Sequence, residues 1–338
     1  MVGDTRHMKI PFAPAVYEHA ARFTGHTPWE VSRNAELLFA GHCAAWREYR
    51  HPALTVGIDI YNLEAEAYGA IVEKPAGKGV PAIHQPLLAT LDDGLLLPPF
   101  NPQEAGRITM VEAGRITMVI AVGQRLQQEL PEADVRIPVA GPFSLAFNLL
   151  GINTLCEEAA LEPEKTAQLL MRLAENQTGF CRAIAAAGLD VAFFESAAAP
   201  PLLSPQQFHG LELPALKRIL TIAADCVGHP VPCIMGGNTF PIVNDILTTG
   251  TDFLVANVET DQQAFVAHVA RTRPHVRVRV NMDSGVVASH EPARIRREID
   301  RILDFVGGRS NCLLGTGALP LETPPENIRL IREYVAGL

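Results

Sequence analysis

Polar side chains that can do chemistry follow short apolar stretches at several points along the sequence. Carboxylates, amides, hydroxyls and one thiol occupy these places, a set that suits proton transfer and the orientation of a polar substrate. These residues are Asp59, Asn62, Glu64, Glu66, Ser144, Glu195, Ser196, Cys233, Asn238, Asn257, Glu259, Asn281, Asp283 and Thr316. No cluster of arginines or lysines stands among them, so we expect a site rich in carboxylates and amides.

Glu195 is the strongest candidate for a functional carboxylate. It lies in "FFESAAAPP", where an ionised group among apolar neighbours is costly unless it binds something. Asp59 and Asp283 have a second interpretation, as N-caps of the helices that follow them. Cys233, in "PCIMGGN", is either a buried structural thiol or a contact with a ligand. Among the scattered histidines, His84 in the loop "PAIHQP" is the one that we expect nearest to a pocket.

The elements that position these residues alternate along the chain. Residues 15–49 have a helical period, with a capping box at Thr27 and Glu30 that predicts a helix start. Amphipathic helical stretches then separate short apolar runs that are typical of strands in a parallel sheet covered on both faces. The seven runs are 53–62, 134–142, 189–196, 231–237, 252–257, 276–283 and 312–317.

This alternation predicts an α/β fold, a single (β/α)8 TIM barrel domain spanning 1–338. An N-terminal helical segment occupies 1–50. No linker divides the chain, and no GxGxxG motif follows a strand, which disfavours a dinucleotide-binding sheet. Residues 73–103, rich in Pro and Gly, predict a long loop over the barrel mouth. In such barrels the active site lies at the carboxyl ends of the strands, where the polar residues above are found.

Composition limits the class of protein. Of 338 residues, 48% are hydrophobic and 19% charged, which is globular, and the net charge of -9 disfavours a nucleic-acid partner. We find neither a signal peptide nor an apolar stretch long enough to span a membrane, and therefore expect a soluble, cytoplasmic protein. The six cysteines lie far apart without CxxC pairs, so we expect free thiols.

An octamer, "EAGRITMV", occurs twice in succession between Glu104 and Val119. Two copies of eight residues cannot form a repeat fold, whose units are about 20 to 50 residues long. Only the second copy continues into a helical pattern, so we interpret the first copy as an insertion tolerated at the surface. A functional loop is the alternative.

Four motifs, in order, resemble the uroporphyrinogen decarboxylase (URO-D) superfamily. "GPFSLAFNLLG" is similar to its GPxT helix entry, and "GLDVAFFESAAAPPLLSPQQF" resembles its GADxxxxxDSxxxxLSPxxF stretch. "PCIMGGNTFPIVNDILTTGTDFL" is similar to its strand, Gly-Asn turn and helix, and "GTGALPLETPPENIRLI" resembles its closing signature, GHGxxPxTPxEN. The resemblance implies a (β/α)8 barrel.

Two activities of that superfamily compete. In the decarboxylases an arginine motif of the form RQAGR supplies charge for a tetrapyrrole, and an aspartate in an "SDI" strand end contacts it. Here "RHMKIPFAPAVYEHAARF" stands in place of the arginine motif, Asp59 matches the aspartate, and Asn148 replaces the tyrosine that follows GPxT. "NLEAEAYGA" looks more like the second branch, the corrinoid-dependent methyltransferases.

That second branch binds zinc through a His-x-Cys pair and a distant Cys, which stabilises a thiolate acceptor. The corresponding places read Cys233-Ile-Met235 and Thr316, so the resemblance leaves one good ligand, Cys233. A zinc site then needs further ligands from Glu64, Glu195, His84 or Cys312.

The leading hypothesis is therefore methyl transfer to or from a corrinoid such as methylcobalamin, carried by a partner protein. Decarboxylation of a porphyrinogen or smaller carboxylate, with Asp59 stabilising the protonated pyrrole, is the alternative. A non-catalytic barrel that binds a tetrapyrrole or corrinoid protein is the third. Asp59, Glu64 and Glu195 are the predicted catalytic residues, and Cys233 is the predicted metal ligand. The predicted substrate-binding residues are Asn62, Glu66, His84, Ser144, Asn148, Asn238, Asn281 and Thr316.

Overall fold

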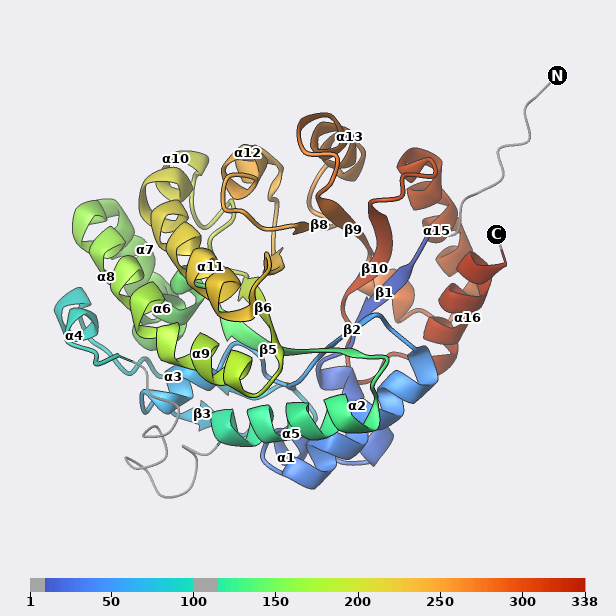
Figure 1. Ribbon diagram of the computed structural model, residues 1–338, viewed down its shortest axis with the longest axis horizontal. Coiled ribbons are helices and arrows are strands. Elements are labelled where there is room, and N and C mark those ends of the chain that lie inside the picture. Colours follow the sequence, from blue (N-terminus) through green and yellow to red (C-terminus); the bar gives the residue numbers. More distant parts are fainter. Residues whose placement is uncertain (1–9, 100–114, 338) are drawn as a thin grey trace.

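Eight parallel strands surround one axis in the computed structural model, which describes residues 10–99 and 115–337 (Figure 1). They form two four-stranded sheets, with the orders β1-β10-β9-β8 and β2-β5-β6-β7, that together make the predicted barrel. The strands are β1 (Phe12–Ala15), β2 (Ala53–Thr55), β5 (Asp134–Ala140), β6 (Asp190–Glu195), β7 (Cys233–Met235), β8 (Phe253–Ala256), β9 (Arg277–Met282) and β10 (Cys312–Ala318). All seven predicted strands are present, and β1 is the eighth.

The seam between β7 and β8 is joined by side chains in place of a backbone ladder. The hydroxyl of Thr251 accepts a hydrogen bond from the Cys233 amide at 3.1 Å and donates one to the Val231 carbonyl at 2.8 Å. At the carboxyl end of the same seam, the Asn257 amide donates to the Met235 carbonyl at 2.7 Å. A short polar side chain thus satisfies backbone groups that an open sheet would leave unpaired.

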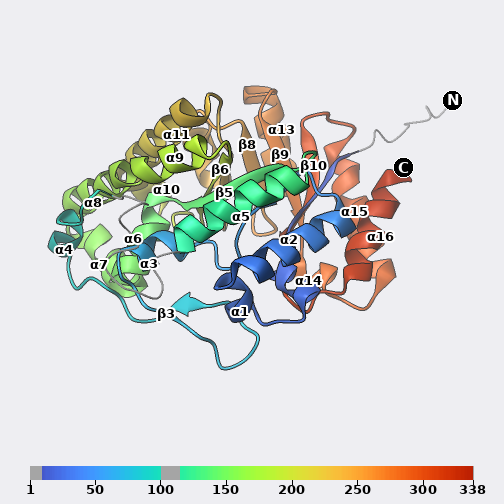
Figure 2. The same ribbon diagram turned by 60° about the horizontal axis from the view of Figure 1, so that its bottom comes forward.

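Helices cover the outer face of the barrel, and α2 and α5 lie side by side there (Figure 2). The predicted capping box at Thr27 and Glu30 is confirmed. The N-terminal helices are a 3-10 helix (Glu18–Thr24), α1 (Pro28–Ser32) and α2 (Ala35–Tyr49). The next are α3 (Leu63–Ala67), α4 (Leu91–Leu95), α5 (Arg115–Glu129), α6 (Pro142–Leu150), α7 (Ile152–Leu161), α8 (Pro163–Asn176) and α9 (Thr178–Ala186).

The second half follows the same alternation. It contains α10 (Pro205–Gln207), a π-helix (Phe208–Glu212), α11 (Leu213–Val227), a 3-10 helix (Phe240–Ile242), α12 (Val243–Ile246), α13 (Gln262–Thr272), α14 (Ser284–Val287), α15 (Pro292–Val306) and α16 (Pro325–Ala336). Asp283 is the N-cap of α14 and accepts from the Val286 amide at 3.0 Å, so its capping interpretation is confirmed.

The segment predicted as a long loop contains more structure than its sequence indicated. A short antiparallel hairpin joins β3 (Val72–Glu73) and β4 (Ala82–Ile83), and α4 follows it. The Pro81 carbonyl accepts from Asn62, just after β2, which ties the hairpin to the carboxyl ends of the strands. Residues 100–103, and the octamer up to residue 114, lie outside the described residues. The rest of the second copy, from Arg115, begins α5.

Candidate functional site

Asp59, after β2, belongs to a buried network of ion pairs. Arg115 Nη1 lies 2.8 Å from Asp59 Oδ2, and Arg115 Nε lies 2.9 Å from Glu66 Oε2. Arg33 Nη2 reaches the other oxygen of Glu66 at 2.9 Å, and Asn62 donates to Asp59 at 3.0 Å. The side chains of Asp59 and Arg115 are 3% and 6% exposed. Three predicted site residues, Asp59, Asn62 and Glu66, therefore come together. They bind arginines or one another and are buried from solvent.

Glu64, in α3, fastens the carboxyl end of β5. Its Oε1 accepts from the Ala140 amide at 2.7 Å and from Gln177 at 3.3 Å, and Gln177 also donates to the Ala140 carbonyl at 2.8 Å. Burial raises the pKa of Glu64 to about 7, although the hydrogen bond from Ala140 opposes the shift. The carboxyl group holds the strand end in place and does not point into the barrel mouth.

Replacing Glu64 with glutamine should flatten part of the pH dependence of stability. Because the folded-state pKa of about 7 lies above the ordinary 4.5, folding binds a proton here, and this contribution is present below pH 4.5 and lost as pH rises through 7. The wild type should lose up to about 3 kcal/mol relative to Glu64→Gln across that window. Urea unfolding from pH 4.5 to 8 measures it. The exposed Glu164→Gln, in α8, is the matched control, and equal slopes in all three proteins would contradict the assignment.

Glu195 ends β6 with its side chain turned away from the barrel interior, toward α6. Its Oε1 accepts from the Ser144 hydroxyl at 2.5 Å and the Ala197 amide at 3.1 Å, and its Oε2 accepts from the Ser144 amide at 3.1 Å. Glu212 lies against it, and burial followed by the charge of Glu195 raises the pKa of Glu212 far above its usual range. The two buried carboxyl groups lie beside each other where the end of β6 meets the helices.

The predicted zinc ligand, Cys233, is buried on the outer face of β7, next to this carboxyl pair. Burial, and then the charges of Glu195 and Glu212, raises the pKa of its thiol, which opposes the thiolate that zinc requires. Thr316 is buried and accepts from the Ala15 amide at 3.0 Å, and His84 is exposed. Within residues 10–99 and 115–337 no three His, Cys, Asp or Glu side chains are placed to hold a metal. The residues present do not fit the zinc set, so we derive no step through zinc.

Five residues at the carboxyl ends of the strands form what we call the mouth ring: Tyr17, Tyr61, Ser196, Asn257 and Asn281. Asn281 donates to Asn257 at 3.0 Å. The rings of Tyr17 and Tyr61 both meet Phe194 edge-on, at centroid distances of 5.5 and 6.1 Å. Ser196 is exposed, whereas Asn281 is buried. These contacts link the ends of five strands around a floor made by Phe194.

Two other predicted residues support this region from outside the ring. Asn148 donates to the Tyr61 carbonyl at 2.6 Å and so fixes the backbone that carries the Tyr61 ring. Asn238 accepts from the Phe240 amide at 3.3 Å within its own turn, and from the Thr260 hydroxyl, after β8, at 3.5 Å. Three of the candidate strand-end residues, Ser196, Asn257 and Asn281, are in the ring, and of these only Asn281 was among the predicted substrate-binding residues. The two tyrosines were not predicted.

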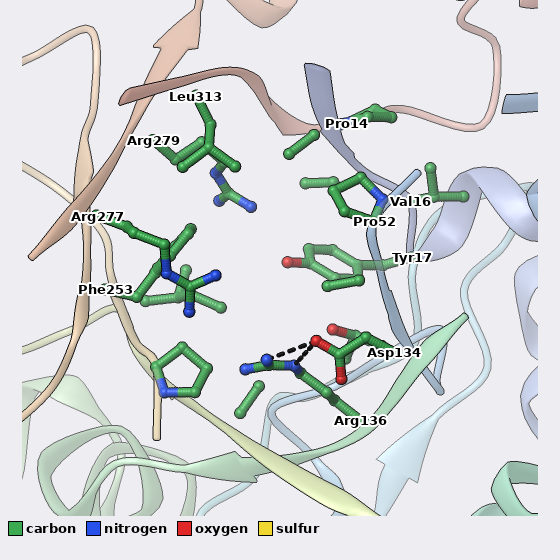
Figure 3. Close-up of a pocket in the computed structure, with 17 residues that line it drawn as sticks. Pro14, Val16, Tyr17, Pro52, Asp134, Arg136, Phe253, Arg277, Arg279 and Leu313 are labelled. Atoms are coloured by element: carbon green, nitrogen blue, oxygen red, sulfur yellow. Dashed lines mark hydrogen bonds and ion pairs between the residues drawn. The ribbon is translucent and has the colours of Figure 1, made fainter. Parts of the chain in front are cut away.

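A cavity lies deeper in the barrel, below the Tyr17 ring (Figure 3). Its volume is about 90 Å³, and its lining includes Arg136, Arg277 and Arg279. The sequence prediction of few arginines concerned the strand ends and did not extend to the barrel interior, where these three arginines gather. The alternation in "VRVRVNMD" is the signal that was available, because a period of two places Arg277, Arg279 and Asn281 on one face of β9.

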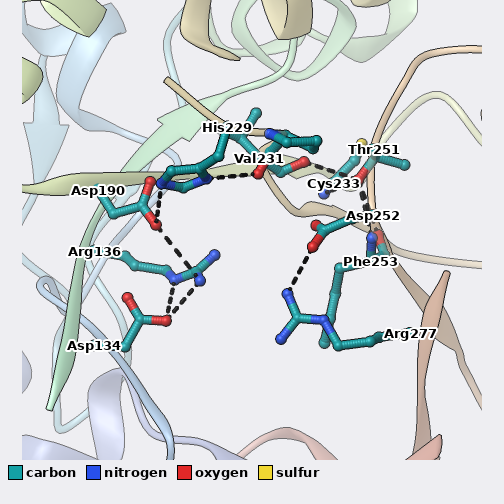
Figure 4. A network of polar contacts seen from close by, with 11 residues as sticks. Asp134, Arg136, Asp190, His229, Val231, Cys233, Thr251, Asp252, Phe253 and Arg277 are labelled. Atoms are coloured by element: carbon teal, nitrogen blue, oxygen red, sulfur yellow. Dashed lines mark hydrogen bonds and ion pairs between the residues drawn. The ribbon is translucent and has the colours of Figure 1, made fainter. Parts of the chain in front are cut away.

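Carboxylates neutralise two of the three arginines (Figure 4). Arg136 Nη2 lies 2.6 Å from Asp134 and 3.5 Å from Asp190, and Arg277 lies 3.0 Å from Asp252. Together these pairs tie the first residues of β5, β6 and β9 to their neighbours. Arg279 differs, because its hydrogen bond goes to the neutral amide of Asn281.

Known proteins agree with this architecture. Two curated relatives, the uroporphyrinogen decarboxylases of two Thermus thermophilus strains, are each 27% identical over 317 residues, which is 89% of this chain and 79% of the relative. A methyltransferase from Methanosarcina mazei, 18% identical, superposes with a TM-score of 0.81 over 97% of this chain and 94% of its own, a likeness in fold. No helix within the described ranges is long and apolar enough to cross a membrane. The family model described as uroporphyrinogen decarboxylase (URO-D) matches residues 4–338, and the chain therefore belongs to the URO-D family.

Proposed function

We propose that this protein transfers a methyl group between a corrinoid, carried by a partner protein, and a small acceptor. The observation that supports this proposal most directly is the engagement of Asp59. Decarboxylation would need that carboxylate to face a protonated pyrrole, whereas Arg115 and Asn62 occupy it and 3% of the side chain is exposed. Asp59, the carboxylate on which decarboxylation would depend, is thus already bound by Arg115 and Asn62.

The charge at the mouth supports the same choice. A tetrapyrrole with several carboxylates needs cations where it enters, usually arginines with free donors. The mouth ring instead presents amides and hydroxyls, and the nearby Arg33 and Arg115 are paired with Glu66 and Asp59. An uncharged rim accommodates a methyl donor without removing water from a charged side chain.

The ring would orient the acceptor and not deprotonate it. Burial, and then the neighbouring Tyr17, raises the pKa of Tyr61, so its hydroxyl stays protonated at neutral pH and donates hydrogen bonds. The electron pair of the acceptor would form the new bond to the methyl carbon, the electron pair of the cobalt–carbon bond would stay on the corrinoid, and the proton of the acceptor would be released to water. Glu64 and Glu195 are positioning residues in this scheme, because they hold the ends of β5 and β6.

A methyl-transfer assay tests the proposal. Purified protein is incubated with methylcobalamin and a panel of small thiols and amines, and the loss of the methylcobalamin absorbance is followed together with the mass of the acceptor. Asn281→Ala should lower turnover by about tenfold or more, because it removes a hydrogen-bonding group from the ring. Asn244→Ala, an exposed amide on α12, is the control and should leave turnover unchanged.

Parallel incubations separate the competing functions. Carbon dioxide release from uroporphyrinogen, with methylcobalamin left intact, would replace the proposal with decarboxylation. Tight binding of either tetrapyrrole without conversion would support a non-catalytic barrel instead. Elemental analysis of the same samples should find less than one zinc per chain; a stoichiometric zinc that is lost in Cys233→Ser would restore the metal-dependent mechanism.

A further inference from the structure

Arg279 is a buried cation without a carboxylate partner in the described part of the chain. The residue is 7% exposed on β9, and no carboxylate among those residues forms an ion pair with it. Its Nε donates to Asn281 Oδ1 at 3.0 Å, and its guanidinium carbon lies 5.9 Å from the centroid of the Phe253 ring. By contrast, Arg136 and Arg277, which line the same cavity, are both paired with aspartates. A buried charge of this kind is costly unless an opposite charge reaches it.

A glycine on the neighbouring strand nevertheless leaves room for the Arg279 side chain. Gly315, on the neighbouring strand β10, faces Arg279, and a Cβ at position 315 would lie 2.4 Å from Arg279 Cγ and 2.5 Å from Cδ. The same Cβ would lie 2.7 Å from Asn281 Oδ1, the group that holds Arg279 Nε. The conformation of Arg279 therefore depends on the absence of a side chain across the sheet.

The guanidinium of Arg279 borders the interior cavity, opposite Tyr17 (Figure 3). The cavity holds several water-sized groups, since one water needs about 10–15 Å³ of such volume. Apart from the arginines, Tyr17 and Asp134, its lining is mainly apolar, and it includes Ala192, Ile234, Phe253 and Leu313. Asp134 is turned to Arg136, with both Nε and Nη2 of that arginine on one carboxylate oxygen. The carboxylate in the lining is therefore already paired and does not repel an anionic ligand.

We propose that this cavity binds a small organic monocarboxylate, with its carboxylate on Arg279 and its hydrocarbon part against the apolar wall. The Tyr17 hydroxyl supplies a second donor, since burial raises its pKa even though the charge of Arg279 opposes the shift. Most of the lining comes from the first residues of β5, β8 and β9, whereas Tyr17, and Asn281 through its hydrogen bond with Arg279, also belong to the mouth ring. The site thus adjoins the proposed methyl-transfer site from inside the barrel, and butyrate binding is measured without that reaction.

The test measures the thermal midpoint of the full chain against sodium butyrate at constant ionic strength, without a corrinoid. The wild-type midpoint should rise with butyrate concentration and saturate, whereas sodium chloride should not reproduce the rise. Arg279→Met should weaken butyrate binding by about tenfold or more, because it removes a charge-assisted contact. Without butyrate, the same variant should be at least as stable as the wild type, since it removes an unpaired buried charge.

Arg271→Met, an exposed arginine on α13, is the matched control and should keep the wild-type response. If Arg279→Met does not fold, Arg279→Lys serves in its place: it keeps the charge but loses the planar set of donors, and should also bind butyrate more weakly. An unresponsive wild type, a response equalled by chloride (an inorganic anion only), or an equal response in the Arg279 variants would each overturn the proposal. Because no corrinoid is present, these outcomes are independent of the methyl-transfer assay.

Discussion

Replacing Arg115 with methionine should lower the free energy of unfolding by about 3–5 kcal/mol, the range expected when one partner of a buried ion pair is removed. The variant leaves Asp59 and one oxygen of Glu66 without the cation that lies 2.8 and 2.9 Å from them. Both carboxylates are 3% exposed, so water cannot replace the guanidinium. Urea unfolding followed by circular dichroism at pH 7 measures the loss.

A matched arginine lies ten residues further along the same helix. Arg125 pairs with Glu36 at 2.7 Å on the surface, and Arg125→Met should leave the midpoint unchanged within error. Combining Arg115→Met with Asp59→Asn should recover part of the loss, because Asp59 is then no longer an unpaired buried charge and Glu66 keeps its ion pair with Arg33. If Arg115→Met behaves like Arg125→Met, or if the combined variant recovers nothing, the network does not stabilise the fold in this way.

The order of elements was readable from sequence because strands buried on both faces appear as apolar runs between amphipathic helices. The eighth strand, β1, was not, since Phe12–Ala15 is short, contains a proline and directly precedes a helical pattern. Its pairing also depends on β10, about 300 residues away, through contacts such as Phe12 with Leu314. No local pattern carries that information.

The direction of the strand-end side chains could not be read for a related reason. Along β6, Phe194 faces the barrel interior and Glu195 faces the helices, yet the four residues 191–194 that precede Glu195 are all apolar, so alternation does not distinguish the two faces. The carboxylates at the strand ends were expected to face a substrate, and the structure places Asp59, Glu64 and Glu195 against arginine, amide and hydroxyl partners inside the protein. Their catalytic roles remain predictions, which variants in the methyl-transfer assay would test.

Gly141→Ala should be among the most damaging small substitutions in the chain, with an expected loss of about 3 kcal/mol or more. Gly141 precedes α6 with an ordinary backbone conformation, so the cause is contact and not strain. A Cβ there would lie 2.2 Å from Glu195 Oε2 and 2.8 Å from Glu195 Cβ. The carboxylate would have to move off the amide and hydroxyl of Ser144 and leave buried polar groups without partners. Urea unfolding measures the effect, and Gly210→Ala is the control, because a Cβ at position 210 meets no atom within 4 Å.

A double-mutant cycle with Glu195→Ala identifies the cause of that loss. Truncating Glu195 removes the atoms that the new methyl group would strike, so Gly141→Ala should cost much less in the Glu195→Ala background, with a coupling of about 1–3 kcal/mol. The double variant should remain less stable than the wild type. Glu195→Ala removes the acceptor of the Ser144 hydroxyl and of the Ala197 amide whether position 141 is glycine or alanine. Additive losses would mean that position 141 acts through some other contact. Strong coupling would show that the glycine of "GPFSLAFNLLG" is required because the buried Glu195 carboxylate fills the space beside it.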